Sequence, residues 1–399
     1  MKKLSTNSLI LSAVLIVAAS SFNCVRPEEP SAGGNPQIER ALESQGIKIT
    51  TQKSLEEEII IPDRYFQAAL REVLKKPEGP ILPSDLAGLD RLALDDFFIR
   101  YASNLSGLER CSGLRNFSLS GSQVRDLSPL ARLQSLETIV LNRTQVDDLA
   151  PLAGLTKLKI LMIIEAPIRD LSPLARLTNL EKLTLNQVPA SDFSFLSHLP
   201  NLEKLSLDGT GFQDWKRLAG LSKLQSLSLN NNGISEIGSL PRLTSLTSLN
   251  LDGNRISDFS RLRELPKLTG LSLRDNGLDD LSGLADLKEL RVLDLGRNRI
   301  ADVSRLKGLL QLREVKLEEN RVAEITGLVE NSRQGGLGRD EEVWLGNNPL
   351  SERAKAEEIP YLESRGVKVI LGTIEDLMSG KVKGEPRPVY RINRKGKEK

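Results

Sequence analysis

The sequence predicts an α/β repeat fold, a curved solenoid whose coils each add one strand to a parallel inner sheet. First, leucines recur every 22 residues from Leu108 to Leu328 without interruption. Second, the leucine spacing inside each unit changes from three to two residues, which is typical of a helical or 3₁₀ return followed by a strand. Third, aromatic residues make up only 4% of the chain, so leucine must fill the interior.

One representative unit runs from Leu240 to Asp258. Its strand carries Leu249 and Leu251, which face the same side because side chains alternate along a strand. No single unit can bury its leucines alone, so neighbouring coils must stack. At a strand spacing of ~4.8 Å, about 12 coils give an inner arc on the order of 55 Å.

Two polar columns repeat with the same period. An inward-facing Asn amide can both donate and accept, and so tie adjacent coils together. Asn occupies this position at 232, 254, 276, 298, 320 and 348, whereas the earlier coils carry Ser122, Thr144, Ala166, Val188 and Thr210. The second column, as in Asp126-Leu-Ser-Pro, is expected to cap each return turn.

The two ends of the repeat need caps that shield the core. Asp63 is placed to N-cap a helix at the front, and Ser351 to N-cap one at the back. We therefore expect an N-terminal helical cap at 57–85, repeats at 86–350 and a C-terminal cap at 351–371.

The N-terminal residues carry an export signal. Lys2 and Lys3 precede an apolar run of about 11 residues, too short to span a bilayer, and then small residues. Residues 1–23 are thus a signal peptide, followed by a Pro- and Gly-containing tether at 24–56. The segment ending at Cys24 resembles a bacterial lipoprotein processing site, although Ser21 and Asn23 depart from the common pattern. Lipidation of Cys24 would anchor the protein in the bacterial envelope; ordinary cleavage near Ala19–Ser21 would leave it periplasmic or secreted.

Charge is unevenly distributed along the chain. Residues 381–399 hold eight Lys or Arg against two Glu, a net of +6, inside a basic tail at 372–399. Residues 24–380 carry a net charge of −6. The tail is either a solvated end or a contact for anionic lipid or cell-wall polymer.

The repeat resembles the internalin-type leucine-rich repeats of bacteria. Asp126-Leu-Ser-Pro-Leu130, the Leu-x-x-Leu-x-Leu-x-x-Asn pattern and the 22-residue period carry this resemblance. Ile61-Pro-Asp63 and Gly346-Asn-Asn-Pro-Leu350 resemble the two caps of such proteins. The resemblance covers about residues 59–371 and implies a curved leucine-rich-repeat solenoid with a 3₁₀ or helical outer face. The immunoglobulin-like domain and wall-sorting motif of many internalins are not found, so a host-invasion role is not implied.

No catalytic constellation is found in the sequence. A nucleophilic triad would have to use His198, the single histidine, which falls on an outer return segment. No phosphate loop, zinc spacing or calcium loop is present. We therefore expect no enzyme activity, no cofactor and no metal site.

The strand positions that face the concave side are the candidate binding residues. Val140, Ile160, Met162 and Ile164 are apolar where other coils carry polar residues, which favours an interface, unless a loop or the tether covers them. Asn186, Asp208, Asn230 and Asp252 form a polar column that suits a basic or hydroxyl-rich partner, or is simply a solvated face. Trp344 is a third candidate, either for binding or for capping.

Two functions follow from these observations. The first is a non-catalytic, monomeric module on the cell envelope that recognises a partner protein through its concave face and binds no nucleic acid. The alternative is a structural envelope scaffold, held by its lipid and basic tail, without a specific protein ligand.

Overall fold

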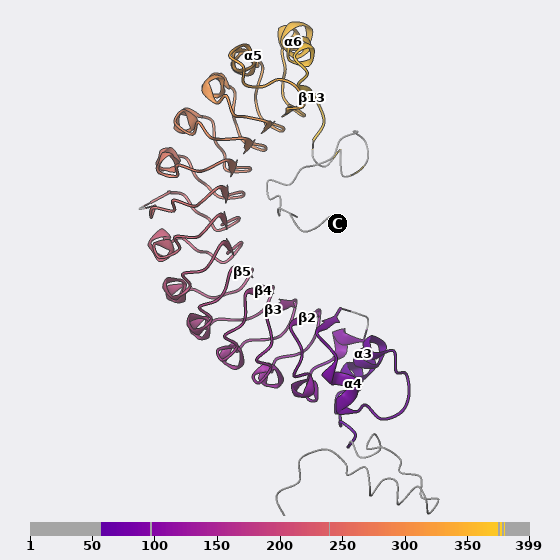
Figure 1. The fold of residues 1–399 in the computed structure, drawn as a ribbon. Helices are drawn as coiled ribbons and strands as arrows, with labels where there is room; N and C mark the ends of the chain where they lie inside the picture. Colours follow the sequence, from indigo (N-terminus) through magenta and orange to yellow (C-terminus); the bar gives the residue numbers. More distant parts are fainter. Residues whose placement is uncertain (1–56, 96–97, 239, 374–375, 377–378, 380–399) are drawn as a thin grey trace, which may run out of the picture. The chain divides into compact units, whose positions relative to one another are not determined.

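The computed structural model describes residues 57–95, 98–238, 240–373, 376 and 379. The expected signal peptide, Cys24 and the tether lie outside these residues, as does most of the basic tail. Thirteen strands form one parallel sheet in sequence order, as the leucine period predicts. Figure 1 shows the strands following one another along the inner side of the stack, with the return segments on the outer side.

Most of the strands fall into two groups that differ in length. They are β1 (Arg91–Leu94), β2 (Asn116–Ser120), β3 (Thr138–Asn142), β4 (Ile160–Ile164), β5 (Lys182–Asn186), β6 (Lys204–Ser206), β7 (Ser226–Ser228), β8 (Ser248–Asn250), β9 (Gly270–Ser272), β10 (Val292–Asp294), β11 (Glu314–Lys316), β12 (Glu342–Trp344) and β13 (Lys368–Ile370). Strands β2 to β5 have five residues, and β6 to β13 have three. The longer strands belong to coils that lack the Asn.

Most returns are short 3₁₀ helices of three to five residues. They are η1 (Ile99–Tyr101), η2 (Leu108–Arg110), η3 (Ser128–Leu130), η4 (Ala150–Leu152), η5 (Ser172–Arg176), η6 (Ser194–His198), η7 (Trp215–Leu218), η8 (Ser260–Glu264), η9 (Ser282–Leu284) and η10 (Ser304–Gly308). The aspartate column caps them as expected: Ser128 N donates to Asp126 Oδ1 at 2.7 Å, and Ser282 N donates to Asp280 Oδ1 at 2.9 Å.

The coil at Leu240 departs from the expected helical return. None of its described residues between η7 and η8 is helical. Glu236 occupies the position of the capping Asp and pairs with Asp258 in an isolated bridge instead. Pro241 removes a further backbone donor. Glu236 and Pro241 thus distinguish this coil from the coils whose returns form 3₁₀ turns.

The core is a continuous stack of leucines. Leu249, Leu271 and Leu293, which pair across adjacent strands, have none of their surface exposed. Trp215 is only 4% exposed and fills the core beside the leucines. Phe193 and Phe212 meet edge to face at 5.2 Å between ring centroids.

The asparagine ladder ties the later coils together. Asn276 donates from Nδ2 to Leu251 O at 3.0 Å and accepts from Ile256 N at 3.1 Å. Asn232, Asn254, Asn298 and Asn320 likewise each donate to a carbonyl 25 residues earlier. Buried backbone groups need such partners, so this ladder stabilises the turns.

Helices close both ends of the described solenoid. At the front, α3 (Arg64–Leu74) is N-capped by Asp63, which accepts from Tyr65 N and Phe66 N, and α4 (Pro83–Ala87) follows. Near the back, α5 (Thr326–Arg333) replaces the last 3₁₀ return. A π-helical segment (Ala354–Glu358) then continues into α6 (Ile359–Ser364), and Ser351 caps it through a bond from Ala354 N.

Candidate functional site: the inner face of the sheet

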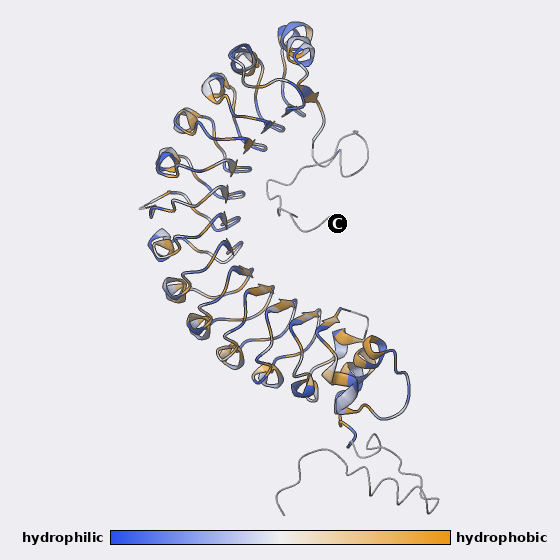
Figure 2. Cartoon of the chain, viewed as in Figure 1, coloured by the Kyte–Doolittle hydropathy of each residue, from blue (hydrophilic) through white to orange (hydrophobic). Residues whose placement is uncertain are grey.

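The predicted apolar residues form one patch on β3 and β4. Parallel register places Val140 opposite Met162 and Ile164 opposite Asn186. Val140, Ile160, Met162 and Ile164 are all half-buried, whereas the alternate residues of both strands are buried in the core. β4 is hydrophobic throughout its length, as its colour in Figure 2 shows. We call these four side chains the apolar patch.

A hollow borders the apolar patch on its N-terminal side. It has a volume of about 560 Å³ and is lined in part by Tyr101, Ser120, Asn142 and Arg143. Asn142 pairs with Ile164, so the hollow and the patch meet at the ends of β3 and β4. Tyr101 is 50% exposed. Sequence reasoning missed it because it lies in η1, outside the regular strand positions.

The predicted polar column continues the row of Ile164 across β5 to β8. It is a hydrogen-bonded ladder in which each side chain accepts from the backbone of the next coil. Asn186 Oδ1 accepts from Asp208 N at 3.1 Å, and Asp208 Oδ1 accepts from Asn230 N at 2.8 Å. Asn230 Oδ1 then accepts from Asp252 N at 2.9 Å. One oxygen of each residue is therefore committed to structure, and the rest of each half-buried side chain remains on the inner face.

Asp252 lies at the end of this column in an unusual electrostatic setting. Burial, together with the negative charge of Asp294, raises the pKa of its carboxyl to about 6. Hydrogen bonds from Ser272 Oγ and Arg274 N to Oδ1 oppose this shift. The carboxyl therefore titrates near neutral pH.

A cluster of charged side chains occupies the inner face of β9 to β12. Its carboxylates are Asp294, Glu314, Glu318, Glu319 and Glu342, and its basic residues are Arg274, Arg297 and Lys316. Lys316 Nζ lies 2.9 Å from Glu314 Oε1 and 4.0 Å from Asp294 Oδ2. We call this set the acidic cluster, because five carboxylates face three basic side chains. The sequence predicts that single members of the acidic cluster face inward, because strand positions alternate. It does not predict which of them pair with one another.

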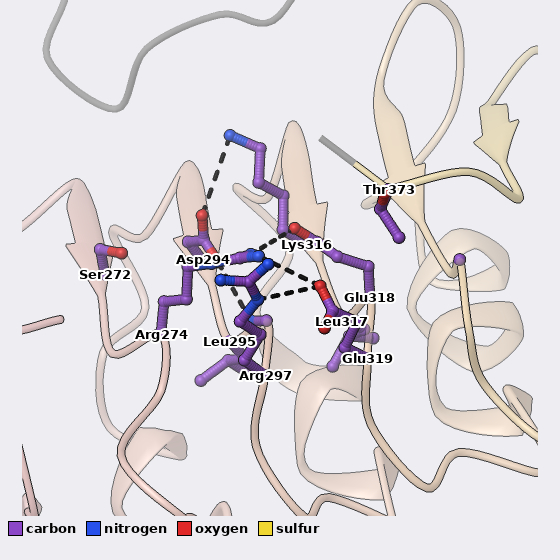
Figure 3. Close-up of polar contacts among 12 residues, drawn as sticks. Ser272, Arg274, Asp294, Leu295, Arg297, Lys316, Leu317, Glu318, Glu319 and Thr373 are labelled. Atoms are coloured by element: carbon purple, nitrogen blue, oxygen red, sulfur yellow. Dashed lines mark hydrogen bonds and ion pairs between the residues drawn. The ribbon is translucent and has the colours of Figure 1, made fainter. Parts of the chain in front are cut away.

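Arg274 joins coils that are not neighbours. Its guanidinium reaches Glu318, 44 residues away, and lies 3.5 Å from Glu319 Oε1, which also accepts from Arg297 Nε at 2.9 Å (Figure 3). Gly296 makes this path possible, since a Cβ there would lie 2.2 Å from Arg274 Nη1. Burial and the charge of Asp294 raise the pKa of Glu318.

Trp344 occupies the inner face of β12, opposite Ile370 of β13. It is fully buried but lies outside the leucine core. Its indole Nε1 has no hydrogen-bond partner in the described part of the chain. Binding and capping therefore both remain predictions for Trp344.

The described residues hold little reactive chemistry. His198 is exposed on η6, and its Nδ1 lies 3.2 Å from Ser197 Oγ. Burial raises the pKa of the Cys111 thiol to about 12, so the nucleophilic thiolate does not form near neutral pH. No group of three or more His, Cys, Asp or Glu side chains in the described ranges could hold a metal ion.

None of the helices in the described ranges is long and apolar enough to cross a membrane.

The chain was compared with known families and structures. The family model described as a leucine-rich repeat region matches residues 84–302. No curated protein matches the chain by sequence. Among solved structures, an internalin (inlF) from Listeria monocytogenes is 27% identical, with a TM-score of 0.61; the match covers 80% of this chain and 98% of that one.

Two more distant structures share the fold alone. A leucine-rich repeat protein from Leptospira interrogans is 19% identical with a TM-score of 0.52, over 73% of this chain and 86% of that one. Mouse RP105, solved in complex with MD-1, is 22% identical with a TM-score of 0.58, over 71% and 51%. Proteins of this fold generally act in protein–protein recognition. With its 22-residue coils, single parallel sheet and matching family model, the chain belongs to the leucine-rich repeat family and is similar to the bacterial internalins.

Proposed function

We propose that this protein is a non-catalytic module that binds a partner protein through the inner face of β3 to β8. The observation that carries the proposal is the apolar patch: four apolar side chains on an open sheet face that is polar in the neighbouring coils. When a partner covers apolar surface that was in contact with water, the free energy of the system falls, which favours binding.

The surroundings of the patch support a protein ligand. The hollow beside it offers Tyr101, an aromatic side chain of the kind that dominates interface energetics. On the other side, the column from Asn186 to Asp252 places half-buried amide and carboxylate groups on the inner face. Asp208 Oδ2 accepts from the Nδ2 atoms of Asn186 and Asn230 only at long distances, 3.4 and 3.5 Å, so these groups can exchange such bonds for contacts with a partner. An apolar centre with a polar border is the usual arrangement of a protein interface.

The N-terminal sequence supports a place in the cell envelope. Residues 1–23 have the layout of a signal peptide, and Cys24 stands where a bacterial lipoprotein is lipidated. We propose that the mature protein is exported, anchored by a lipid on Cys24, and monomeric. The alternative is an envelope scaffold whose inner face has no specific ligand.

The test is capture of partners from an envelope extract by immobilised protein, followed by mass spectrometry and measurement of affinity for whatever is recovered. Ile160→Asp combined with Ile164→Asp should reduce affinity at least tenfold, because two carboxylates would have to be desolvated in the interface.

The matched control is Ile60→Asp combined with Leu310→Asp, which changes two exposed apolar residues away from the patch, 82% and 39% exposed. This variant should bind like the parent. Normal binding by the Ile160/Ile164 variant would exclude the patch and leave the Asn186–Asp252 column as the candidate surface. Recovery of no specific partner by the parent would favour the scaffold.

A further inference from the structure

The acidic cluster contains buried polar atoms that the described chain does not satisfy. Glu318 is fully buried; its Oε1 accepts from Arg274, but its Oε2 has no partner among the described residues. In the next coil, Glu342 Oε2 and Trp344 Nε1 are also buried and have no hydrogen-bond partner among the described residues. Buried carboxylate oxygens without donors are costly, so the complete protein is expected to supply donors here.

N–H groups that approach from the inner face, and cationic ones above all, are suitable donors for these carboxylate oxygens. Trp344 lies outside the leucine core, so what shields it is on the strand face rather than inside the coil. The carboxylates also outnumber the basic side chains of the cluster. A ligand rich in Lys and Arg would supply charge-assisted hydrogen bonds to the oxygens, and its backbone carbonyls would accept from the indole.

The continuously described part of the chain ends at Thr373, beside the acidic cluster. Gly372 packs on Gly346, at the end of β12, so closely that a Cβ on Gly346 would lie 2.2 Å from Gly372 O. Thr373 is only 4% exposed. Residue 381, where the basic run begins, follows eight residues later, a reach of at most roughly 26–29 Å. The strands β9 to β12 span only about 14 Å, so the run can reach every member of the acidic cluster.

We propose that the acidic cluster is the docking site for the basic run of this same chain, residues 381–399. Its eight Lys and Arg, with a net charge of +6, complement the carboxylates of β9 to β12. Glu318 and Glu342 accept from the tail, and the tail shields Trp344. This docking site lies outside the apolar patch, so it stands or falls independently of the proposed partner binding.

The test uses the full mature chain in soluble form, with Cys24→Ala, and with Trp215→Phe so that Trp344 is the single tryptophan. In a tail-neutral variant, all eight Lys and Arg of 381–399 become Gln. Its Trp344 emission should shift to longer wavelength, and backbone amides of β11 and β12 should exchange at least tenfold faster. Added salt of about 1 M should shift the parent in the same direction and leave the tail-neutral variant unchanged.

A double-mutant cycle separates docking from a purely structural role of the carboxylates. In a Glu318→Gln, Glu342→Gln background, neutralising the tail should change the exchange rates of the β11 and β12 amides less than twofold. In the matched control, Glu181→Gln with Glu203→Gln on β5 and β6 coils, the tenfold effect should remain.

Several outcomes would overturn the proposal. Unchanged emission and exchange in the tail-neutral variant would show that the tail does not dock. Loss of the parent's protection on dilution, with a dimer seen by sedimentation, would assign the cluster to the tail of a second copy. An unprotected cluster together with tail-dependent binding to phosphatidylglycerol vesicles would assign the tail to lipid.

Discussion

Leu249 lies at the centre of β8 with none of its side chain exposed, between Leu227 and Leu271 of the adjacent strands. Truncating a leucine in such a site loses its transfer free energy and leaves a cavity. Leu249→Ala should therefore lower the free energy of unfolding by about 2–5 kcal/mol. Denaturant melts measure this, with Leu310→Ala, 39% exposed, as the control expected to lose less. A loss below about half a kcal/mol at Leu249 would mean that the coil register is wrong.

Asp252 makes stability depend on pH. Its folded pKa of about 6 lies above the ordinary value of 3.8, so the folded chain binds the proton more tightly than the unfolded chain. The contribution of this group to stability is therefore greatest near pH 4 and declines as the pH rises towards 6. Two pKa units correspond to roughly 3 kcal/mol.

Asp252→Asn removes the charge but keeps the oxygen that accepts from Ser272 and Arg274. This variant should be more stable than the parent at pH 7, by up to roughly 3 kcal/mol, and should lack the decline between pH 4 and 6. Melts across pH 4–8 test it, with Asp280→Asn as the control that keeps the decline, because the pKa of Asp280 is lowered. Identical pH profiles of parent and Asp252→Asn would contradict the assignment.

The elements of the solenoid differ in how their turns are held. The coils from Asn232 onward are joined by amide side chains, but Ala166 and Val188 have no polar side chain for this role. Thr144 Oγ1 is buried and has no hydrogen-bond partner among the described residues. The same coils have strands two residues longer, which adds backbone bonds in the sheet. Local stability can therefore vary along the solenoid.

Hydrogen exchange measures this difference directly. Amides of residues 136–190 should exchange faster than those of 249–300, because the turns of the first group lack the asparagine bonds. The apolar patch lies in this segment, so a bound partner should slow its exchange. Equal protection of the two segments in the free protein would show that the longer strands compensate fully.

At the scale of the whole molecule, the proposed lipid anchor on Cys24 would decide where the solenoid works. Cys24→Ala should move the protein from the membrane fraction to the soluble fraction, because the lipid would be lost. Mass spectrometry of the parent should find a lipidated cysteine as the first residue. An unmodified start at Ser21 or Phe22 would instead indicate ordinary signal cleavage.

Much of this structure could be predicted from local patterns. The 22-residue leucine period sets a coil of constant length, and coils of constant length can stack only in sequence order, which gives the parallel sheet. Asp63 and Ser351 located the capping helices because an N-cap acts within three residues of itself. The alternation within β3 and β4 likewise placed the apolar patch on the inner face, since side-chain direction is a local property of a strand.

Only the tertiary structure shows which polar groups form hydrogen bonds within the solenoid and which stay available on its inner face. The side chains from Asn186 to Asp252 each give an oxygen to the next coil, a choice that depends on rotamers and on strand ends. Arg274 passes one intervening coil to reach Glu318 because Gly296 of that coil leaves room for the guanidinium. The burial of Glu318 and Trp344 likewise appears in no spacing pattern. Sequence determines where a side chain lies along its strand, whereas its partners and exposure depend on packing between coils that are distant in sequence.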